Sequence, residues 1–292
     1  MMRAPSAWAV AVRTPDGEME YVSHRLPRLT SRSRWARIPL IRGVLVLGES
    51  LTLGFRALAW SGQRSAGEDE EPVTTGQMAT SMTLAAVFFV AVFIVVPLLA
   101  ARWGGFDASS VVFHLVEAVV RIGMLVGYIW LIGRWEEIGR VFAYHGAEHM
   151  TIHAYEAGDP LDLAHIGTYR PEHPRCGTSF LLIVMLTAIV VFSLVGSLPW
   201  YWLIASRVVL IPLVAGISYE ILKLGGSQAD RLPGRILTAP GLWLQRLTTR
   251  EPDESMIEVA VVALLHALTD DEVREVEARG PIAPGSLSAY RG

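Results

Sequence analysis

The chain has 292 residues, of which 52% are hydrophobic and 18% are charged. Soluble domains carry roughly 25% charged residues, and the shortfall here is concentrated in a few long apolar runs, which is typical of membrane spans rather than of a large soluble core. The formal net charge of −3 gives no bulk basicity, so we expect no nucleic-acid partner, and the single cysteine, Cys176, excludes an intrachain disulfide.

The amino-terminal part of the chain, residues 1–76, is predicted to begin with a small β-hairpin. Apolar residues alternate over residues 6–22 on both sides of Asp16 and Gly17. An Asp-Gly pair between two alternating runs is a strong signal for a tight hairpin turn.

An amphipathic helix is predicted next, over residues 38–60. Its apolar residues recur at helical spacing, but Glu49 and Arg56 interrupt them, and an Arg-rich stretch precedes it. Such a helix fits the membrane interface better than the hydrocarbon core. Residues 61–76 are predicted to form an acidic linker.

Four segments within residues 77–222 are predicted to cross a bilayer, since each approaches the length of about 20 residues that a spanning helix needs. These segments are residues 78–101, 111–132, 180–195 and 200–222. Lys and Arg are concentrated in alternating flanking regions, which predicts that both termini and the loop 134–179 are cytoplasmic. We therefore expect a multi-pass protein of the cytoplasmic (inner) membrane, with lipid as its first partner.

Residues 223–292 are predicted to be cytoplasmic. A second interfacial helix is expected over 235–250, an ordinary charged helix over 254–279, and a disordered tail after it, because the last residues are rich in Gly and Pro. The predicted fold class is therefore mainly α: four transmembrane helices, two interfacial helices and the small hairpin.

Charged residues within the predicted spans form a further feature. Glu117 and Arg121 lie in the second span, near His114, and Arg207 lies in the fourth at a similar depth. Charges at this depth usually face the bundle interior and are paired. Either a proton or substrate path or a packing ion pair between Glu117 and Arg207 explains them.

The loop 134–179 carries five of the eight histidines. His145, Glu148 and His149 form the spacing H-x-x-E-H, in which two imidazoles one helical turn apart can meet one ion and the Glu can act on water as a general base. Glu148 is thus the candidate catalytic residue.

His173 and Cys176 follow at a spacing that suits joint metal ligation. Together with His145 and His149 they predict a set of four donors that favours zinc. Four bound donors would make a closed structural site, and three would leave a position for water. His153, Glu156 and Glu220 are further candidates for residues that support the ion.

Three motifs together resemble the YqhQ-like family of uncharacterised bacterial membrane proteins, and the resemblance covers nearly the whole chain. The motifs are His145-Gly-Ala-Glu-His149, His173-Pro-Arg-Cys-Gly-Thr-Ser-Phe180 and Pro240-Gly-Leu-Trp-Leu-Gln-Arg-Leu-Thr-Thr-Arg-Glu-Pro252. That family has been labelled as predicted metal-dependent enzymes, a label that names no reaction. Two departures are that the chain begins at what resembles the Met-Met of a longer family start, and that Met150 stands where a Lys is common.

Two functions are compatible with these residues. The first is a membrane protein with a zinc-type site at its cytoplasmic face that acts as a metal-dependent hydrolase. The second is a non-catalytic factor that assists the assembly of other membrane proteins, with a structural metal or a polar histidine cluster holding the loop in place.

Overall fold

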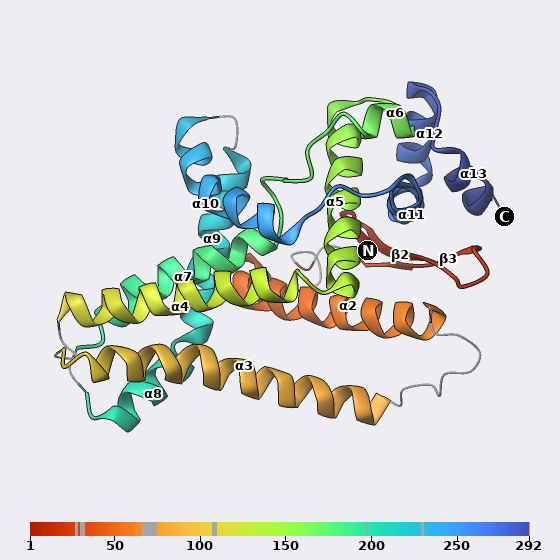
Figure 1. Ribbon diagram of the computed structural model, residues 1–292. Helices are drawn as coiled ribbons and strands as arrows, with labels where there is room; N and C mark the ends of the chain where they lie inside the picture. The colour runs from red at the N-terminus through yellow and green to blue at the C-terminus, as the bar shows by residue number, and fades with distance from the viewer. Residues whose placement is uncertain are drawn as a thin grey trace.

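The computed structural model describes residues 1–26, 29, 33–65, 75–106, 110–196, 198–228 and 231–291. It is mainly helical, with a small sheet at the amino terminus, and both termini lie on the same side of the long helix α5, Glu136–Ala157 (Figure 1). The predicted linker 61–76 falls mostly outside the described residues, since α2 continues to Ser65 and α3 begins at Thr75.

The predicted hairpin is confirmed and gains a third strand. Strands β1 (Met2–Arg3), β2 (Ala7–Arg13) and β3 (Met19–Arg25) form an antiparallel sheet in the order β1-β2-β3. Gly17 adopts a φ of 85° in the turn between β2 and β3, a conformation that glycine reaches without the steric cost that a side chain brings. Trp8 of β2 packs on the helix α2.

Within the part of the chain that the structure describes, three helices are long and apolar enough to cross a membrane. They are α2 (Ile41–Ser65), which follows the short helix η1 (Arg34–Arg37), α3 (Thr75–Trp103) and α4 (Val111–Ile132). Within α2 the mean hydropathy is 1.2, against 2.9 in α3 and 1.9 in α4. The interfacial position predicted for α2 is consistent with this low value and stays a prediction.

The remaining predicted spans are shorter or bent. Helix α7 (Thr178–Ser193) is apolar but has only 16 residues. Helices α8 (Trp200–Val209) and α9 (Ile211–Ser227) meet at an angle of 45° next to Pro212, and if the pair counts as one span the candidate spans number four among the described residues. Proline lacks the N–H of a regular helix, which explains a break at this point.

Two cores flank α5. On one side, α3, α4, α7 and α10 (Leu232–Thr248) surround Leu125, Leu182 and Leu244. On the other side, small residues of α5 such as Ala147 and Ala154 pack against α11 (Glu254–Leu265). Figure 1 shows α5 running across the direction of α3 and α4, so it joins the two parts.

The carboxy-terminal segment differs from the prediction in two ways. The helix expected over 254–279 is divided into α11 and α12 (Asp270–Arg279), because Thr269 starts a new helix with a capping box. The tail expected to be disordered instead forms α13 (Pro284–Arg291). Ile282 and Ala283 are buried in the core around α11, and this apolar burial outweighs the local Gly and Pro content.

Candidate metal centre

Helix α5 presents two different faces along its length. Ala143, Ala147, Met150 and Ala154 recur at intervals of three and four residues and are buried, so this strip packs into the core. The histidines lie beside that strip and face the segment between α5 and α7. This segment contains the one-turn helix α6 (Leu163–Ile166) and ends at the start of α7.

Three of the predicted ligands converge. One donor atom each from His145, His149 and Cys176 lies within 4.8 Å of the other two, and His149 and Cys176 are buried. The Nε2 atom of His145 lies 3.1 Å from Sγ of Cys176. Donors bound tetrahedrally to one zinc ion are roughly 3.3–3.7 Å apart, as follows from bond lengths of about 2.0–2.3 Å. The three side chains therefore fit one such ion with small adjustments.

Backbone carbonyl groups hold both imidazole rings in the orientation that a metal requires. Nδ1 of His145 lies 2.9 Å from the carbonyl oxygen of Thr248, and Nδ1 of His149 lies 2.5 Å from that of Pro171. Since a carbonyl oxygen only accepts, each Nδ1 carries a proton, and Nε2 of His145 is directed at the sulfur of Cys176. Histidine ligands of metals commonly donate their second N–H in this way.

The thiol of Cys176 is prepared for the same role. Burial alone would raise the pKa of this thiol. Hydrogen bonds and charge interactions with His145 and His149 outweigh burial and lower the pKa to about 5. Thr178 also donates its backbone N–H to Sγ at 3.3 Å. The thiolate is the form that binds metals, so two imidazoles and a thiolate make a donor set that suits zinc and other late transition ions.

His173 lies outside the group of three converging donors, with its ring centre 5.7 Å from that of His149, so its role as a fourth ligand stays a prediction. Its Nδ1 accepts the backbone N–H of Arg175 at 3.2 Å, and its Nε2 lies 3.3 Å from a carboxylate oxygen of Glu156. Both ring nitrogens are thus occupied. Burial, together with His153, His149 and Arg175, lowers the pKa of His173 to about 3, which keeps the ring neutral.

The supporting residues predicted from the sequence are divided between two places. His153 stays near the centre, with Nε2 2.9 Å from the carbonyl oxygen of Glu172, and Glu156 forms an ion pair with Arg175. Glu220 forms an ion pair with Arg42 of α2, and its predicted role beside the ion stays a prediction. That ion pair joins α2 to α9.

Glu148, the candidate base, forms an ion pair with the amino group of Met1. Its side chain is 29% exposed, so it lies at the surface between α5 and the sheet. Burial lowers the pKa of His145, but its contacts with Cys176 raise the pKa above its ordinary value. The charge of Glu148 makes a smaller contribution in the same direction.

Sequence reasoning did not single out Gln245, which organises the segment that carries Cys176. Its side chain accepts the backbone N–H of His173 at 2.7 Å and donates both to the His173 carbonyl at 2.9 Å and to the Ser179 hydroxyl at 2.8 Å. Gln245 is fully buried. The available signal was its position inside the third motif, near the end of a helix that was predicted to lie at the membrane interface.

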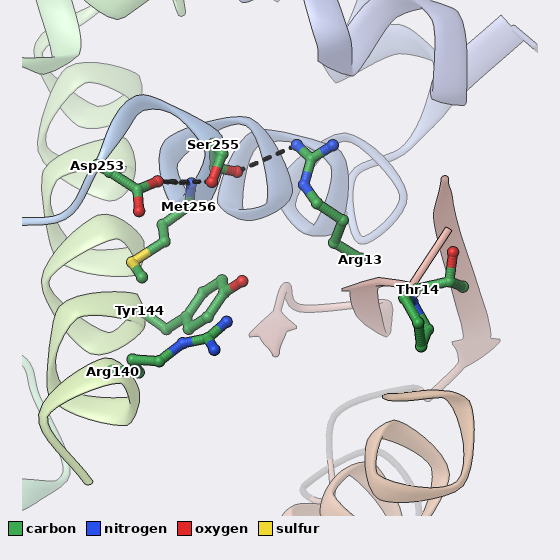
Figure 2. A pocket seen from close by; sticks show the side chains of 8 residues that line it. Arg13, Thr14, Arg140, Tyr144, Asp253, Ser255 and Met256 are labelled. Carbon is green, nitrogen blue, oxygen red and sulfur yellow. Dashed lines mark hydrogen bonds between the residues drawn. The ribbon is translucent and has the colours of Figure 1, made fainter. Parts of the chain in front are cut away.

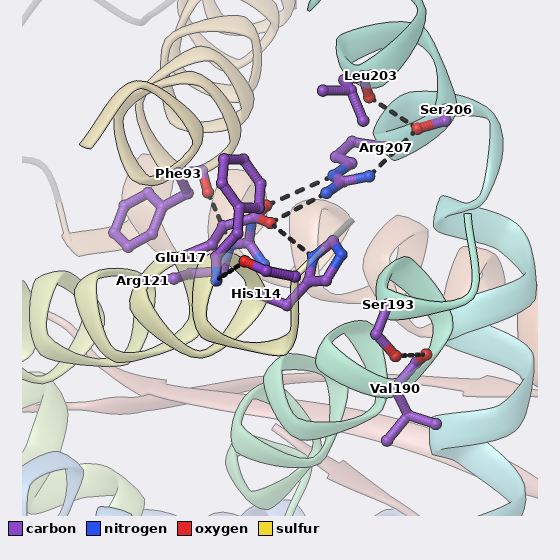
Figure 3. Close-up of polar contacts among 11 residues, drawn as sticks. Phe93, His114, Glu117, Arg121, Val190, Ser193, Leu203, Ser206 and Arg207 are labelled. Atoms are coloured by element: carbon purple, nitrogen blue, oxygen red, sulfur yellow. Dashed lines mark hydrogen bonds and ion pairs between the residues drawn. The ribbon is translucent and has the colours of Figure 1, made fainter. Parts of the chain in front are cut away.

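A second polar cluster lies in the bundle, apart from the metal centre, and confirms the predicted Glu117–Arg207 pair (Figure 3). Arg207 of α8 binds Glu117 of α4 at 3.0 Å, and Arg121 binds the same carboxylate at 2.6 Å. Arg121 also donates to the carbonyl of Phe93 in α3 at 3.0 Å. The cluster therefore joins α3, α4 and α8.

The helices and the three converging donors define a membrane protein with several candidate spans and a possible metal-binding group of two histidines and one cysteine. The chain belongs to the family described as "Protein of unknown function (DUF1385)", whose model matches residues 38–270. It is 33% identical over 276 residues to the uncharacterized protein YqhQ of Bacillus subtilis (strain 168), covering 87% of this chain and 84% of that protein. No solved structure matches the chain.

Proposed function

We propose that the protein is a zinc-type metalloenzyme of the membrane surface, with metal-assisted hydrolysis as its reaction. The convergence of His145, His149 and Cys176 carries this proposal. Three protein donors leave a fourth position, and a bound ion would supply Lewis acidity to a water molecule there.

The residues of the chain would contribute holding and orientation. The carbonyl groups of Pro171 and Thr248 fix the two imidazoles, and the lowered pKa of Cys176 provides the thiolate at neutral pH. Glu148 would serve as the general base only after its carboxylate leaves the amino group of Met1. This movement is a requirement of the proposal.

Metal analysis of the purified protein tests the site. We expect close to one zinc-type ion per chain in the wild type, and loss of the ion in His149→Ala and Cys176→Ser, because each removes one of three donors. His165→Ala is the matched control, since His165 pairs with Asp162 at the surface. An ion content that is unaffected by both donor substitutions would exclude this site.

A structural ion in a non-catalytic assembly factor is the second candidate. Two observations favour this candidate. Glu148 is held in an ion pair with Met1, and none of the three donors lines either of the two described cavities. Cobalt-substituted protein separates the two functions. If the fourth position is open, added azide should change the visible spectrum of the cobalt, whereas an unchanged spectrum would favour a closed structural site.

A further inference from the structure

A cavity of about 520 Å³ lies where the hairpin, the first turns of α5 and the start of α11 meet (Figure 2). This volume is within the range of about 300–1,000 Å³ that is common for small-molecule sites. None of the three metal donors lines the cavity. A ligand bound there would therefore be distinct from the proposed ion and its reaction.

Helix α5 supplies two hydrogen-bond donors to this cavity. Arg140 and Tyr144 are one helical turn apart, and Figure 2 shows the guanidinium and the ring side by side, directed away from α5. Neither the Arg140 guanidinium nor the Tyr144 hydroxyl takes part in a hydrogen bond or ion pair with another described residue. A cation and a hydroxyl that project together suit an oxyanion such as a phosphate.

Arg13 lies on the opposite wall of the cavity, and an ion pair with Glu258 already neutralises its charge. Arg13 donates to the carbonyl oxygen of Gly17 at 3.1 Å and binds Glu258 at 3.0 Å. These contacts hold the guanidinium against α11. Arg13 thus shapes the cavity, and Arg140 is the second cation of its lining. The Ser255 hydroxyl and, to a smaller extent, the charge of Arg140 lower the pKa of Asp253, so Arg140 and Asp253 lie within range of each other's charge.

Asp253 brings a negative charge to the same cavity. One of its oxygens caps α11 by accepting the Met256 N–H at 2.9 Å and the Ser255 hydroxyl at 2.6 Å. The Ser255 hydroxyl, the Met256 N–H and the Ser255 N–H together lower the pKa of Asp253, so the carboxylate is charged at neutral pH. A simple anion would meet repulsion from this carboxylate, whereas a ligand with an ammonium or hydroxyl group beside its phosphate would satisfy both charges.

The base of α5 lies close to the expected membrane surface. Trp130 and Trp135 are 51% and 60% exposed between α4 and α5, and the guanidinium of Arg134 lies 3.7 Å from the centre of the Trp130 ring. Exposed tryptophans beside an arginine are typical of the headgroup region. Arg140 follows within two turns of this position.

We propose that this cavity binds a phosphate ester that carries an amine or hydroxyl group, as phosphoethanolamine does. Arg140 and Tyr144 bind the phosphate, and Asp253 binds the amine. The source of this group is either a phospholipid headgroup or a soluble ester of the same chemistry.

Binding measurements on the full chain in detergent test the proposal, with phosphoethanolamine and inorganic phosphate as probes. In the wild type we expect phosphoethanolamine to bind at least about tenfold more tightly than phosphate, because only the ester reaches Asp253. Arg140→Gln should weaken binding of the ester about tenfold or more. Tyr144→Phe should weaken it several-fold while keeping the packed ring, so that misfolding does not explain the loss.

Asp253→Asn is the most specific variant, because asparagine retains the helix cap and loses the charge. It should remove the preference for phosphoethanolamine over phosphate. Arg134→Gln, which removes a nearby charge that does not line the cavity, is the matched control and should bind as the wild type does. Equal binding of both probes by the wild type, or unchanged binding by Arg140→Gln, would overturn the proposal.

Native mass spectrometry distinguishes the sources. Retention of phosphatidylethanolamine over phosphatidylglycerol in the wild type, but not in Asp253→Asn, supports the proposal with a lipid source. Binding of soluble phosphoethanolamine without that lipid preference supports it with a soluble source.

Discussion

At the scale of single residues, the centre depends on which nitrogen of each histidine is already used. His145 and His149 each use Nδ1 for a backbone carbonyl, which directs Nε2 of His145 at Cys176. His173 uses both nitrogens. The same residue type thus points toward the possible metal-binding group at two positions and contacts Glu156 and Arg175 at the third, and the neighbouring backbone contributes to the difference.

The titration of Cys176 gives a direct test of this arrangement. In metal-free protein, the thiolate absorbance near 240 nm should appear as the pH rises through about 5, because the two histidines lower the pKa of this group below its ordinary 9.0. His145→Gln should move the midpoint upward, toward that ordinary value. Cys176→Ser supplies the baseline, since the chain has no other cysteine. A wild-type midpoint near 9 would contradict the described contact.

At the scale of elements, several contacts require glycine. A Cβ atom at Gly146 would overlap the carbonyl oxygen of Arg250, so α5 lies directly against the connection between α10 and α11. A Cβ atom at Gly216 of α9 would lie 2.8 Å from the carbonyl oxygen of Leu40, just before α2. These approaches hold the long helices close together where no large side chain would fit.

We therefore predict that Gly146→Ala lowers the free energy of unfolding by about 1–3 kcal/mol, the usual range for overpacking. It should also reduce metal content, because Gly146 lies between the two histidine donors. Gly48→Ala is the control, as nothing lies within 4 Å of a Cβ atom at that position in α2. Thermal denaturation in detergent measures both variants. Equal unfolding midpoints for Gly146→Ala and Gly48→Ala would show that α5 and residue 250 are not in close contact.

The buried ion pair makes a prediction about coupling between helices. Arg207→Gln should destabilise the protein by about 3–5 kcal/mol, the usual effect of removing one partner of a buried pair. Glu117→Gln should have a similar effect, because it leaves Arg121 and Arg207 without their shared carboxylate. The double variant should lose less free energy of unfolding than the two single variants lose in sum. Strictly additive losses would show that the pair does not stabilise the fold.

The sequence predicts those parts of the structure that depend on local periodicity. The shared face of His145 and His149 follows from helical geometry, and the hairpin follows from its turn residues. The position of His173 could not be predicted, because it depends on Gln245, which is 72 residues away in the chain. The contact of Glu220 with Arg42 could not be predicted for the same reason, because Arg42 lies on a helix whose packing has no local signal.

At the scale of the whole molecule, the distribution of Lys and Arg predicts that both termini and the metal centre are cytoplasmic. In a Cys176→Ser background, a cysteine at Phe106, between α3 and α4, should react with a membrane-impermeant maleimide added to intact cells. A cysteine at Gly62, near the end of α2, should react only after permeabilisation. The reverse pattern would invert the topology.

The connection between α10 and α11, from Thr248 to Asp253, could couple the binding of the ion to the binding of the phosphate ester. Its first residue holds His145, and its last residue lines the cavity. If either ligand shifts this short connection, thermodynamic linkage requires that the ion and the phosphate ester change each other's affinity by the same factor. Measuring zinc affinity with and without phosphoethanolamine, and the converse, would show whether the two sites communicate. Equal affinities in both comparisons would show that they act independently.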